Sequence, residues 1–450
     1  MASLTQSLAQ FISAPPFGNV PAAAATIIRQ GFIDTIATMI AGRNEPVVHI
    51  VRQVVEAKSS AARESSVLLG QGRAAAQDAA LINGTAAHAL DYDDVALAGH
   101  PSTVLVPALI AEGEAIGASG AALMRGYLVG YELWAELISR DADPHHEKGW
   151  HPTGVFGTLA AAAAIANLRQ LDAQTSRHAI GIAASMASGL VANFGAMTKP
   201  FHAGRAASSG IEAARLAMGG MSAAADAIEH HAGFLAAISP KGNVDLDRPT
   251  QQLGHVLRIL EAGLSVKKYP LCYATHRVID AVIDMARKEN LDPETIQSVH
   301  ATIGVTQHSM LRNHAPLTGL EAKFSLEFAI ASALVARKVG ITELTDSFVN
   351  RDEVRAAMKK VEISTVTTTC PVEPAFSYAD RVKLRLYDGR ELDSGDVRFA
   401  RGNVKLPLRD TELQEKFMDC VRGADHLNAA MLYEQLASLD DIPNVRSLAG

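Results

Sequence analysis

Residues 88–104 read HALDYDDVALAGHPSTV and place two histidines and three aspartates within one short stretch. An alanine-rich run precedes this stretch and the apolar run 104–110 follows it, so the polar residues lie between two predicted helices. If the first helix continues to Asp91, His88 and Asp91 project from the same face. A capped loop between two helices explains the stretch equally well on these residues alone.

Helical periodicity extends outward from this stretch in both directions. Apolar residues recur at three- and four-residue steps, which is typical of amphipathic helices. The predicted helices cover residues 21–42, a segment beginning at Pro46, and residues 74–90, 105–116, 121–140, 155–168, 173–190 and 206–218. No strand is expected between residues 21 and 140.

The character of the sequence changes near Ser265. Alternating β-branched residues predict strands at 298–304 and 361–367, and residues 381–392 predict a hairpin that turns at Asp388-Gly389. Helical periodicity returns at 322–339 and at 410–439. We therefore predict a mainly α fold, with a large all-helical domain and a smaller inserted α+β domain. The predicted boundaries place residues 1–264 and 406–450 in the helical domain and residues 265–405 in the insert.

Composition excludes several classes of protein. The chain has 450 residues and a net charge of -7, and it shows no cluster of lysine and arginine with interleaved aromatics, so nucleic-acid binding is not expected. The most apolar run, residues 155–168, is shorter than the roughly 20 residues that cross a bilayer. We expect a cytoplasmic protein with no membrane partner. Cys272, Cys370 and Cys420 are isolated, so neither a disulfide framework nor an iron–sulfur cluster is indicated.

Four polar segments contain nearly all the residues suited to acid–base chemistry: 91–100, 149–154, 198–202 and 267–276. If the helices run up and down, the loops at alternate junctions meet at one end, and a cleft beside the insert is a common location for an active site. Together these segments supply a carboxylate, histidines and lysines, which can bind a polyanion and move protons near neutral pH. Taken singly, each has a structural explanation: Lys199 as a solvated loop residue, His202 as a core histidine and His276 as a helix cap.

Metal and nucleophile motifs are incomplete. His146 to His151 resembles H-E-x-x-H, but the second histidine is one residue too far and Gly149 interrupts the helix. The aspartates of segment 91–100 could bind magnesium, yet the chain has neither a P-loop nor G-x-G-x-x-G. No G-x-S-x-G elbow occurs. We therefore expect no metal and no cofactor.

The polar segments resemble those of the MmgE/PrpD family, whose members include 2-methylcitrate dehydratase, cis-aconitate decarboxylase and iminodisuccinate epimerase. The matching segments run in order along more than half of the chain. They are Asn83-Gly to Asp94, His100-Pro-Ser, Gly149-Trp-His-Pro-Thr-Gly, Met197-Thr-Lys-Pro-Phe-His-Ala-Gly, Lys267-Lys-Tyr-Pro to Thr275-His276, and Glu321-Ala-Lys-Phe-Ser. The combination is specific to the family but not to one member.

The resemblance implies a metal-free homodimer in which the α+β domain acts as a lid. It also implies which residues line the active site. The catalytic residues carried over by the matching motifs are Asp91, His100, His151, Lys199 and His276. Those assigned to substrate binding are Lys268, His202 and Thr198.

Three departures from the family pattern bear on the reaction. Decarboxylase-like members carry threonine at the position of Val95 and tyrosine at the position of Phe328, so both hydroxyls are missing here. Epimerase-like members have tyrosine where this chain has His146. We expect a lyase that abstracts a proton next to a carboxylate, as a 2-methylcitrate dehydratase does. The alternatives are an epimerase of an amino- or imino-dicarboxylate, a cis-aconitate decarboxylase, and a polycarboxylate-binding protein without catalysis.

Overall fold

The computed structural model describes residues 3–58, 61–373 and 375–449, and the chain forms two compact units. The first unit comprises Met1–Val266 and Asp410–Gly450, and the second comprises Lys267–Arg409. The predicted domain boundaries, and the role of the second unit as a lid, stay predictions.

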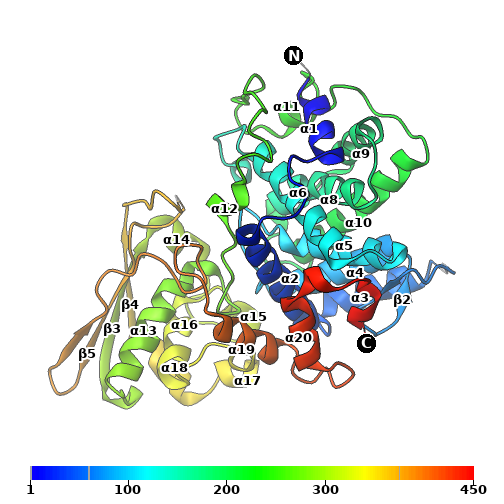
Figure 1. The fold of residues 1–450 in the computed structure, drawn as a ribbon. Coiled ribbons are helices and arrows are strands. Elements are labelled where there is room, and N and C mark those ends of the chain that lie inside the picture. The colour runs from blue at the N-terminus through cyan, green and yellow to red at the C-terminus, as the bar shows by residue number, and fades with distance from the viewer. Residues whose placement is uncertain (1–2, 59–60, 374, 450) are drawn as a thin grey trace. The chain divides into compact units, whose positions relative to one another are not determined.

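The first unit is almost entirely helical (Figure 1). Its longer helices are α1 (Leu4–Ser13), α2 (Ala22–Gly42), α3 (Pro46–Glu56), α4 (Ala76–His88), α5 (Ser102–Ile116), α6 (Gly120–Ile138), α8 (Pro152–Leu168), α9 (Ala173–Met186), α10 (Thr198–Met218), α19 (Asp410–Cys420) and α20 (Ala429–Ala437). Shorter elements are α7 (His145–Lys148), η1 (Val191–Asn193), α11 (Phe234–Ile238), α12 (Arg258–Ala262), η5 (Leu439–Asp441), η6 (Val445–Ala449) and the strand pair β1 (Ser65–Ser66) and β2 (Arg73–Ala74).

Helix α8 lies at the centre of this unit and is buried along its whole length. Helices α5, α6, α9 and α10 pack around it. Small residues at the contacts allow the backbones to approach closely: a Cβ at Gly130 would lie 2.7 Å from the Ala160 carbonyl oxygen. The alanine-rich composition therefore serves close helix packing.

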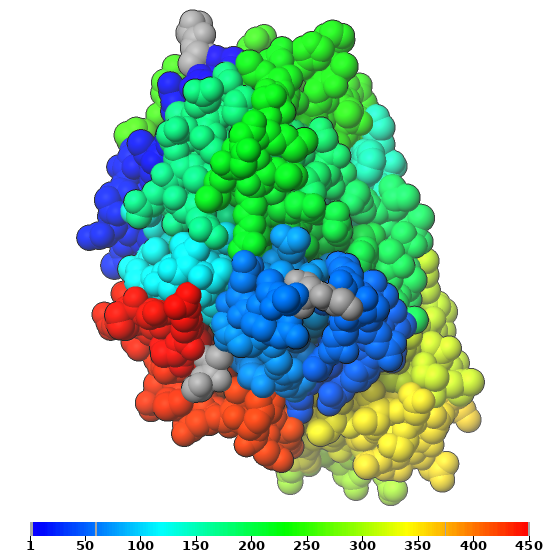
Figure 2. Space-filling view, turned by 90° about the vertical axis from the view of Figure 1, so that its right-hand side faces the viewer, coloured from blue at the N-terminus to red at the C-terminus, as the bar shows by residue number. Residues whose placement is uncertain are grey.

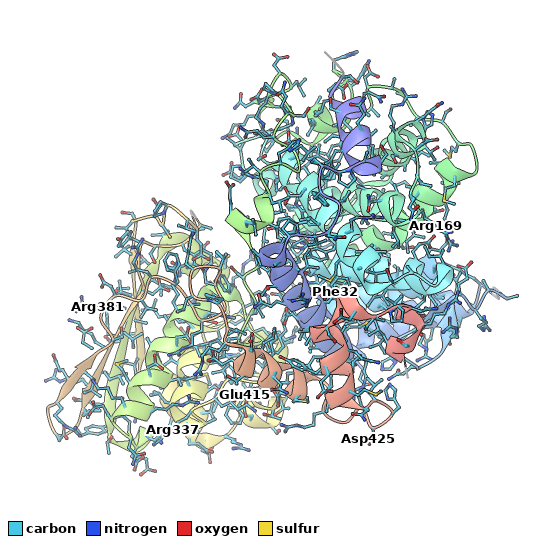
Figure 3. The ribbon with its side chains drawn as sticks, in the orientation of Figure 1. Phe32, Arg169, Arg337, Arg381, Glu415 and Asp425 are labelled. Carbon is cyan, nitrogen blue, oxygen red and sulfur yellow. The ribbon has the colours of Figure 1, made fainter. Side chains whose placement is uncertain are left out.

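The C-terminal residues complete the first unit. Figure 2 shows the end of the chain, in red, at the surface beside the cyan segment near residue 115. Arg446 donates hydrogen bonds to the carbonyl oxygens of Glu114 and Ala115, at 2.6 and 2.9 Å. Helix α19 packs against α2, in which Phe32 is fully buried (Figure 3).

The second unit has a four-stranded sheet in the order β4-β3-β5-β6. Strands β3 and β4 are parallel, and the other neighbouring pairs are antiparallel. Along β5, Val382, Leu384 and Leu386 are buried and alternate with exposed residues, so one face of the sheet is covered. Helix α13 packs against β5 and α16, and α16 packs against α18. The elements of this unit are η2 (Tyr273–Thr275), α13 (His276–Lys288), η3 (Pro293–Thr295), β3 (Ile296–Gly304), α14 (Val305–Met310), α15 (Gly319–Ala322), α16 (Leu326–Val335), η4 (Ile341–Glu343), α17 (Asp346–Val349), α18 (Asp352–Met358), β4 (Val361–Val366), β5 (Arg381–Leu386) and β6 (Glu391–Asp393).

The mainly α fold is confirmed, but several local predictions are wrong. The segment predicted to lack strands contains the pair β1 and β2, because its glycine-containing turn allows a short antiparallel pairing. Helix α10 begins at Thr198 rather than at residue 206, since Pro200 is accommodated in its first turn. The predicted helix 410–439 is two helices, α19 and α20. No helix in the described part of the chain is both long and apolar enough to span a membrane.

Candidate active site

Four of the five predicted catalytic residues, Asp91, His100, His151 and Lys199, lie at or near helix ends of the first unit. Helix α4 ends at His88, α5 begins two residues after His100, α8 begins directly after His151, and α10 begins one residue before Lys199. Helices α4, α5, α8 and α10 are packed against one another. Residues of the first unit that are far apart in sequence therefore lie close together.

The turn between α4 and α5 is held in an unusual backbone conformation. Asp91, Leu97 and Ala98 have φ values of 53°, 50° and 55°, in the left-handed region that residues other than glycine rarely adopt. The helix does not continue to Asp91, so the prediction that His88 and Asp91 share a helical face is wrong. His88 instead contacts Asp93, with 2.9 Å between Nδ1 and Oδ1.

The Asp93 carboxylate bridges two imidazoles. Its second oxygen, Oδ2, lies 2.7 Å from Nδ1 of His100, and Asp93 is completely buried. His100 Nδ1 also lies 2.9 Å from the Asp94 carbonyl oxygen. All three of these oxygens are acceptors when Asp93 is ionised, so both Nδ1 atoms carry a proton.

Asp91 faces Lys199 and His100. Lys199 Nζ donates to Asp91 Oδ1 at 2.7 Å, and His100 Nε2 lies 3.9 Å from the same oxygen. The three side chains keep between 11% and 20% of their surface exposed, unlike the buried groups behind them. A carboxylate, an ammonium and an imidazole are therefore accessible at one point.

His151 and His202 form a second imidazole pair. Their Nδ1 atoms are 3.1 Å apart, and both rings are buried. The backbone of His151 is fixed by a hydrogen bond from its N–H to the Gly189 carbonyl oxygen at 3.0 Å. Gly189 has φ 131° and lies against the His202 ring, a conformation and a proximity that favour glycine. The His151 ring also lies 6.1 Å from that of His88, which connects the two imidazole groups.

Phe194 belongs to this site although the sequence analysis did not single it out. Its ring meets the His151 ring edge-on with 4.8 Å between centroids, and the Lys199 ammonium lies 5.4 Å from its centroid. Phe194 is partly exposed and follows η1. In the sequence, only its position five residues before Lys199 pointed to a place in the site. An apolar wall thus stands beside the cationic group.

Burial controls the charge states of the imidazoles. It lowers the pKa of His88 to about 4 against the opposing effect of Asp93, and it lowers the pKa of His146 to about 4. Burial also lowers the pKa of His151 and, more modestly, that of His202. For Asp93, burial alone would raise the pKa, but the His88 and His100 imidazoles outweigh it and hold the pKa well below its usual value. The site therefore combines an ionised Asp93 with neutral imidazoles at His88, His146, His151 and His202 at pH 7.

The remaining predicted residues are placed as follows. Thr198 is exposed and lines a separate apolar hollow of about 380 Å³ together with residues of α3. Lys268 and His276 belong to the second unit. His276 begins α13, is fully buried, and lies between the rings of Tyr269 and Tyr273, at 5.2 and 5.0 Å.

Distances alone would permit a metal ion in the first unit. One ligand atom from each of His88, Asp91, Asp93 and His100 lies within 4.8 Å of the others. However, Asp91 is paired with the Lys199 ammonium, which repels a cation, and both oxygens of Asp93 are used by imidazoles. The charge arrangement fits a carboxylate-binding site better than a metal centre.

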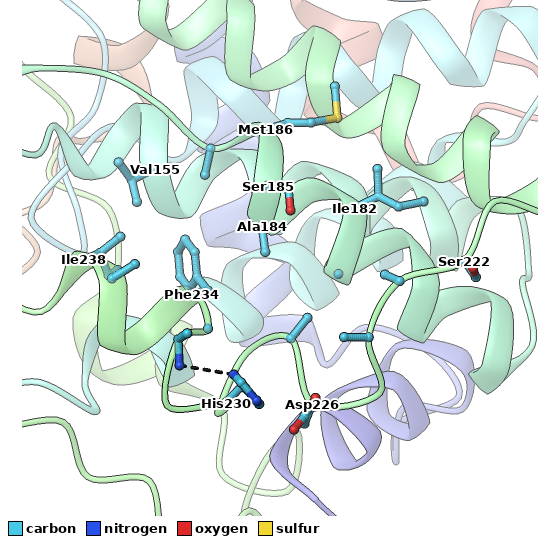
Figure 4. A pocket seen from close by; sticks show the side chains of 18 of the residues that line it. Val155, Ile182, Ala184, Ser185, Met186, Ser222, Asp226, His230, Phe234 and Ile238 are labelled. Carbon is cyan, nitrogen blue, oxygen red and sulfur yellow. Dashed lines mark hydrogen bonds between the residues drawn. The ribbon is translucent and has the colours of Figure 1, made fainter.

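A different hollow of about 740 Å³ lies between α9 and the segment 221–238. Ile182, Met186, Phe234 and Ile238 line it, and the polar side chains of Asp226 and His230 lie at its other side (Figure 4). Its lining includes Trp150 but none of the grouped catalytic residues. It is therefore distinct from the candidate site.

Comparisons with known proteins agree on one family. Residues 6–247 match the MmgE/PrpD N-terminal domain, and residues 269–435 match the MmgE/PrpD C-terminal domain. The cis-aconitate decarboxylase of Homo sapiens is 29% identical over 435 residues, which covers 92% of this chain and 87% of that protein. The enzyme of the same name from Mus musculus is 29% identical, covering 92% and 86%. That of Aspergillus terreus is 24% identical, covering 75% and 73%.

The neutral state of His88 predicts a pH dependence of stability. Its folded-state pKa of about 4 lies below the value of 6.5 for an unperturbed histidine, so between these values the unfolded chain binds a proton that the folded chain does not. Stability conferred by this group is present above pH 6.5 and is lost as the pH falls towards 4. From pH 7 to pH 5 the loss is about 2 kcal/mol.

Urea unfolding of the wild type and of His88→Gln at pH 7 and pH 5 measures this contribution. The variant should lose less stability on acidification than the wild type. Replacement of the exposed His49 by glutamine is the matched control and should retain the wild-type pH dependence. Equal pH dependence in His88→Gln and the wild type would contradict the neutral buried state.

Proposed function

Because the chain belongs to the MmgE/PrpD family, we propose that it is an enzyme of the lyase type acting on a small di- or tricarboxylate. The relatives named above support the lyase class and a small carboxylate substrate. The candidate reactions all remove or replace a group on a carbon next to a carboxylate. Such a reaction needs a base, a cation for the carboxylate and an acid.

One observation carries the assignment of the base. His100 Nδ1 donates to the Asp94 carbonyl oxygen at 2.9 Å and lies 2.7 Å from the buried Asp93 carboxylate, so in the neutral imidazole the lone pair is on Nε2, on the side of Asp91. A carboxylate that fixes the tautomer of an imidazole in this way orients it as a general base. We assign proton abstraction to His100 Nε2, with Asp91 beside it.

Lys199 supplies the positive charge. When the substrate carboxylate binds, its oxygens compete with Asp91 for the ammonium, and the charge that builds up during proton removal is stabilised there. His151 is neutral and buried, so it acts as a hydrogen-bonding group rather than a cation. Phe194 limits access of water to this side of the site.

The first candidate reaction is dehydration, of the 2-methylcitrate dehydratase type. His100 takes the proton from the carbon next to a carboxylate, the electron pair forms the double bond, and the C–O bond of the neighbouring carbon breaks. The hydroxyl leaves as water after it receives a proton from an acid. His100 and His276 are the histidines that could supply this proton; with His100 as the base, we propose His276 as the acid and Lys268 as a substrate ligand.

Decarboxylation is the second candidate, because three relatives are cis-aconitate decarboxylases. In that reaction a C–C bond breaks, CO₂ leaves, and the carbon that retains the electron pair receives a proton. The same residues would act in this reaction. The group that faces the reacting carbon would then have to be protonated, because it delivers a proton instead of removing one. Val95 stands where decarboxylase-like members carry threonine, which favours dehydration here.

The family resemblance also leads us to propose a homodimer. Leu216, Met218 and Met221 are 38%, 45% and 50% exposed at the end of α10, and two of them line the hollow of Figure 4. Exposed apolar residues that cluster in this way support an interaction surface. Light scattering should give twice the chain mass for the wild type, and Met221→Glu should shift it towards the monomer. A monomeric wild type would overturn the proposal.

The reaction itself is tested with a panel of substrates in heavy water, followed by proton NMR. The panel contains 2-methylcitrate, citrate, cis-aconitate and an amino-dicarboxylate. Loss of water identifies a dehydratase, loss of CO₂ a decarboxylase, and exchange with inversion an epimerase. Dehydration is the expected result, and a wild-type protein that transforms none of the panel would overturn the proposed function.

The same assay tests the base. His100→Gln should slow turnover by about 10²–10⁴-fold, the usual contribution of a general base. His255→Gln removes an exposed histidine of the same unit and should leave turnover unchanged. A His100→Gln variant as active as this control would remove His100 from the mechanism.

Metal independence gives a further expectation. Dialysis against a chelator should leave the turnover rate unchanged, because Lys199 already provides the cation at Asp91. Metal analysis of the purified protein accompanies the measurement. Activity that is lost on chelation and restored by one divalent metal would show that the cluster of His88, Asp91, Asp93 and His100 holds an ion.

A further inference from the structure

Helix α19 brings a buried lysine to the turn that carries Asp91. Lys416 is only 6% exposed, although lysine is rarely buried without a partner. Its ammonium lies 2.5 Å from Asp34 Oδ1, where Asp34 belongs to α2. The same nitrogen donates to the Tyr92 carbonyl oxygen at 2.8 Å and lies 3.9 Å from the centroid of the Tyr92 ring.

The hydrogen bond from Lys416 matters because of where Tyr92 lies in the turn. Tyr92 stands between Asp91, which pairs with Lys199, and Asp93, which orients His88 and His100. A hydrogen bond to the Tyr92 carbonyl fixes the peptide plane that joins Tyr92 to Asp93. Because Asp91 is in the left-handed region, at a cost of order 1–3 kcal/mol, its conformation persists only if surrounding contacts impose it.

The charges around Lys416 suit a fixed cation. Asp34, Asp93 and Asp94 are completely buried. Burial raises the pKa of Asp34, and Lys416 opposes that rise; burial and the nearby Asp34 carboxyl raise the pKa of Asp94 well above its usual value. Lys416 pairs with Asp34, and its charge also acts to lower the pKa of Asp94.

We propose that Lys416 is a positioning residue for catalysis, acting through the Tyr92 carbonyl to hold Asp91 and Asp93 in their working orientations. The inference rests on the proposed function, since Asp91 and the His100–Asp93 pair are its reacting groups. It assigns the C-terminal segment, more than 300 residues from the turn in sequence, a part in the chemistry. Both Lys416 and Asp34 are buried.

The test separates positioning from stability. Lys416→Met leaves Asp34 buried and unpaired, so it should lower both thermal stability and kcat. The double variant Asp34→Asn/Lys416→Met removes both charges and should recover much of the stability, but it still lacks the donor to Tyr92. Its kcat should therefore stay about 10- to 100-fold below wild type with a smaller change in KM. Glu415→Gln, at the adjacent exposed position on α19, is the matched control and should behave as wild type (Figure 3).

A second readout does not depend on the substrate. The ¹⁵N shifts of the His88 and His100 imidazoles report the hydrogen bonds of their Nδ1–H groups, to Asp93 Oδ1 and to the Asp94 carbonyl oxygen, and these shifts should change in the double variant even where its stability has returned. Wild-type shifts and wild-type kcat in the stable double variant would overturn the inference. An inactive wild type with altered shifts in the double variant would instead count against the proposed function while supporting the positioning role.

Discussion

The bridge from Asp93 to two imidazoles is the constraint on which the candidate site depends. A carboxylate with no exposed surface needs compensation for its lost hydration, and His88 and His100 supply it from the two sides of the turn. This compensation fixes the turn between α4 and α5 at both ends. It also fixes both imidazole tautomers, so the chemistry available at His100 follows from a structural requirement.

Small residues in the helices make this arrangement possible. Helices α4 and α10 touch at Gly84 and Gly204, where a Cβ on Gly204 would lie 2.2 Å from the Leu81 carbonyl oxygen. Gly84 is one helical turn before His88, and Gly204 is two residues after His202. The close approach of the two backbones at these glycines therefore lies near His88 and His202 in the helices. The abundance of alanine and glycine, which in the sequence indicates only helix packing, also determines how tightly the site closes.

Local patterns in the sequence predicted most of the helices, and the polar segments 91–100, 149–154 and 198–202 of the first unit lie together as expected. The place of segment 267–276 in the site stays a prediction. Asp91, His100 and Lys199 lie together because helix ends meet, and the motifs that contain these residues lie at those ends. Lys416 could not be found in this way, because it lies in an ordinary amphipathic helix and its partners are remote in sequence. The conformation of Asp91 was missed for a related reason: a left-handed residue is imposed by tertiary contacts and not by its neighbours in the chain.

The two departures from the decarboxylase pattern do not carry equal weight. Phe328 is fully buried in the second unit and packs against Phe348 with 6.3 Å between ring centroids, so a residue in this position contributes first to the core. Val95 is partly exposed and directly follows Asp93 and Asp94 in the turn. Its backbone pairs in both directions with Ser265, which fixes the main chain whatever the side chain is. A hydroxyl at residue 95 could therefore be gained or lost while the backbone pairing with Ser265 holds the turn and Asp93 keeps the imidazoles in place.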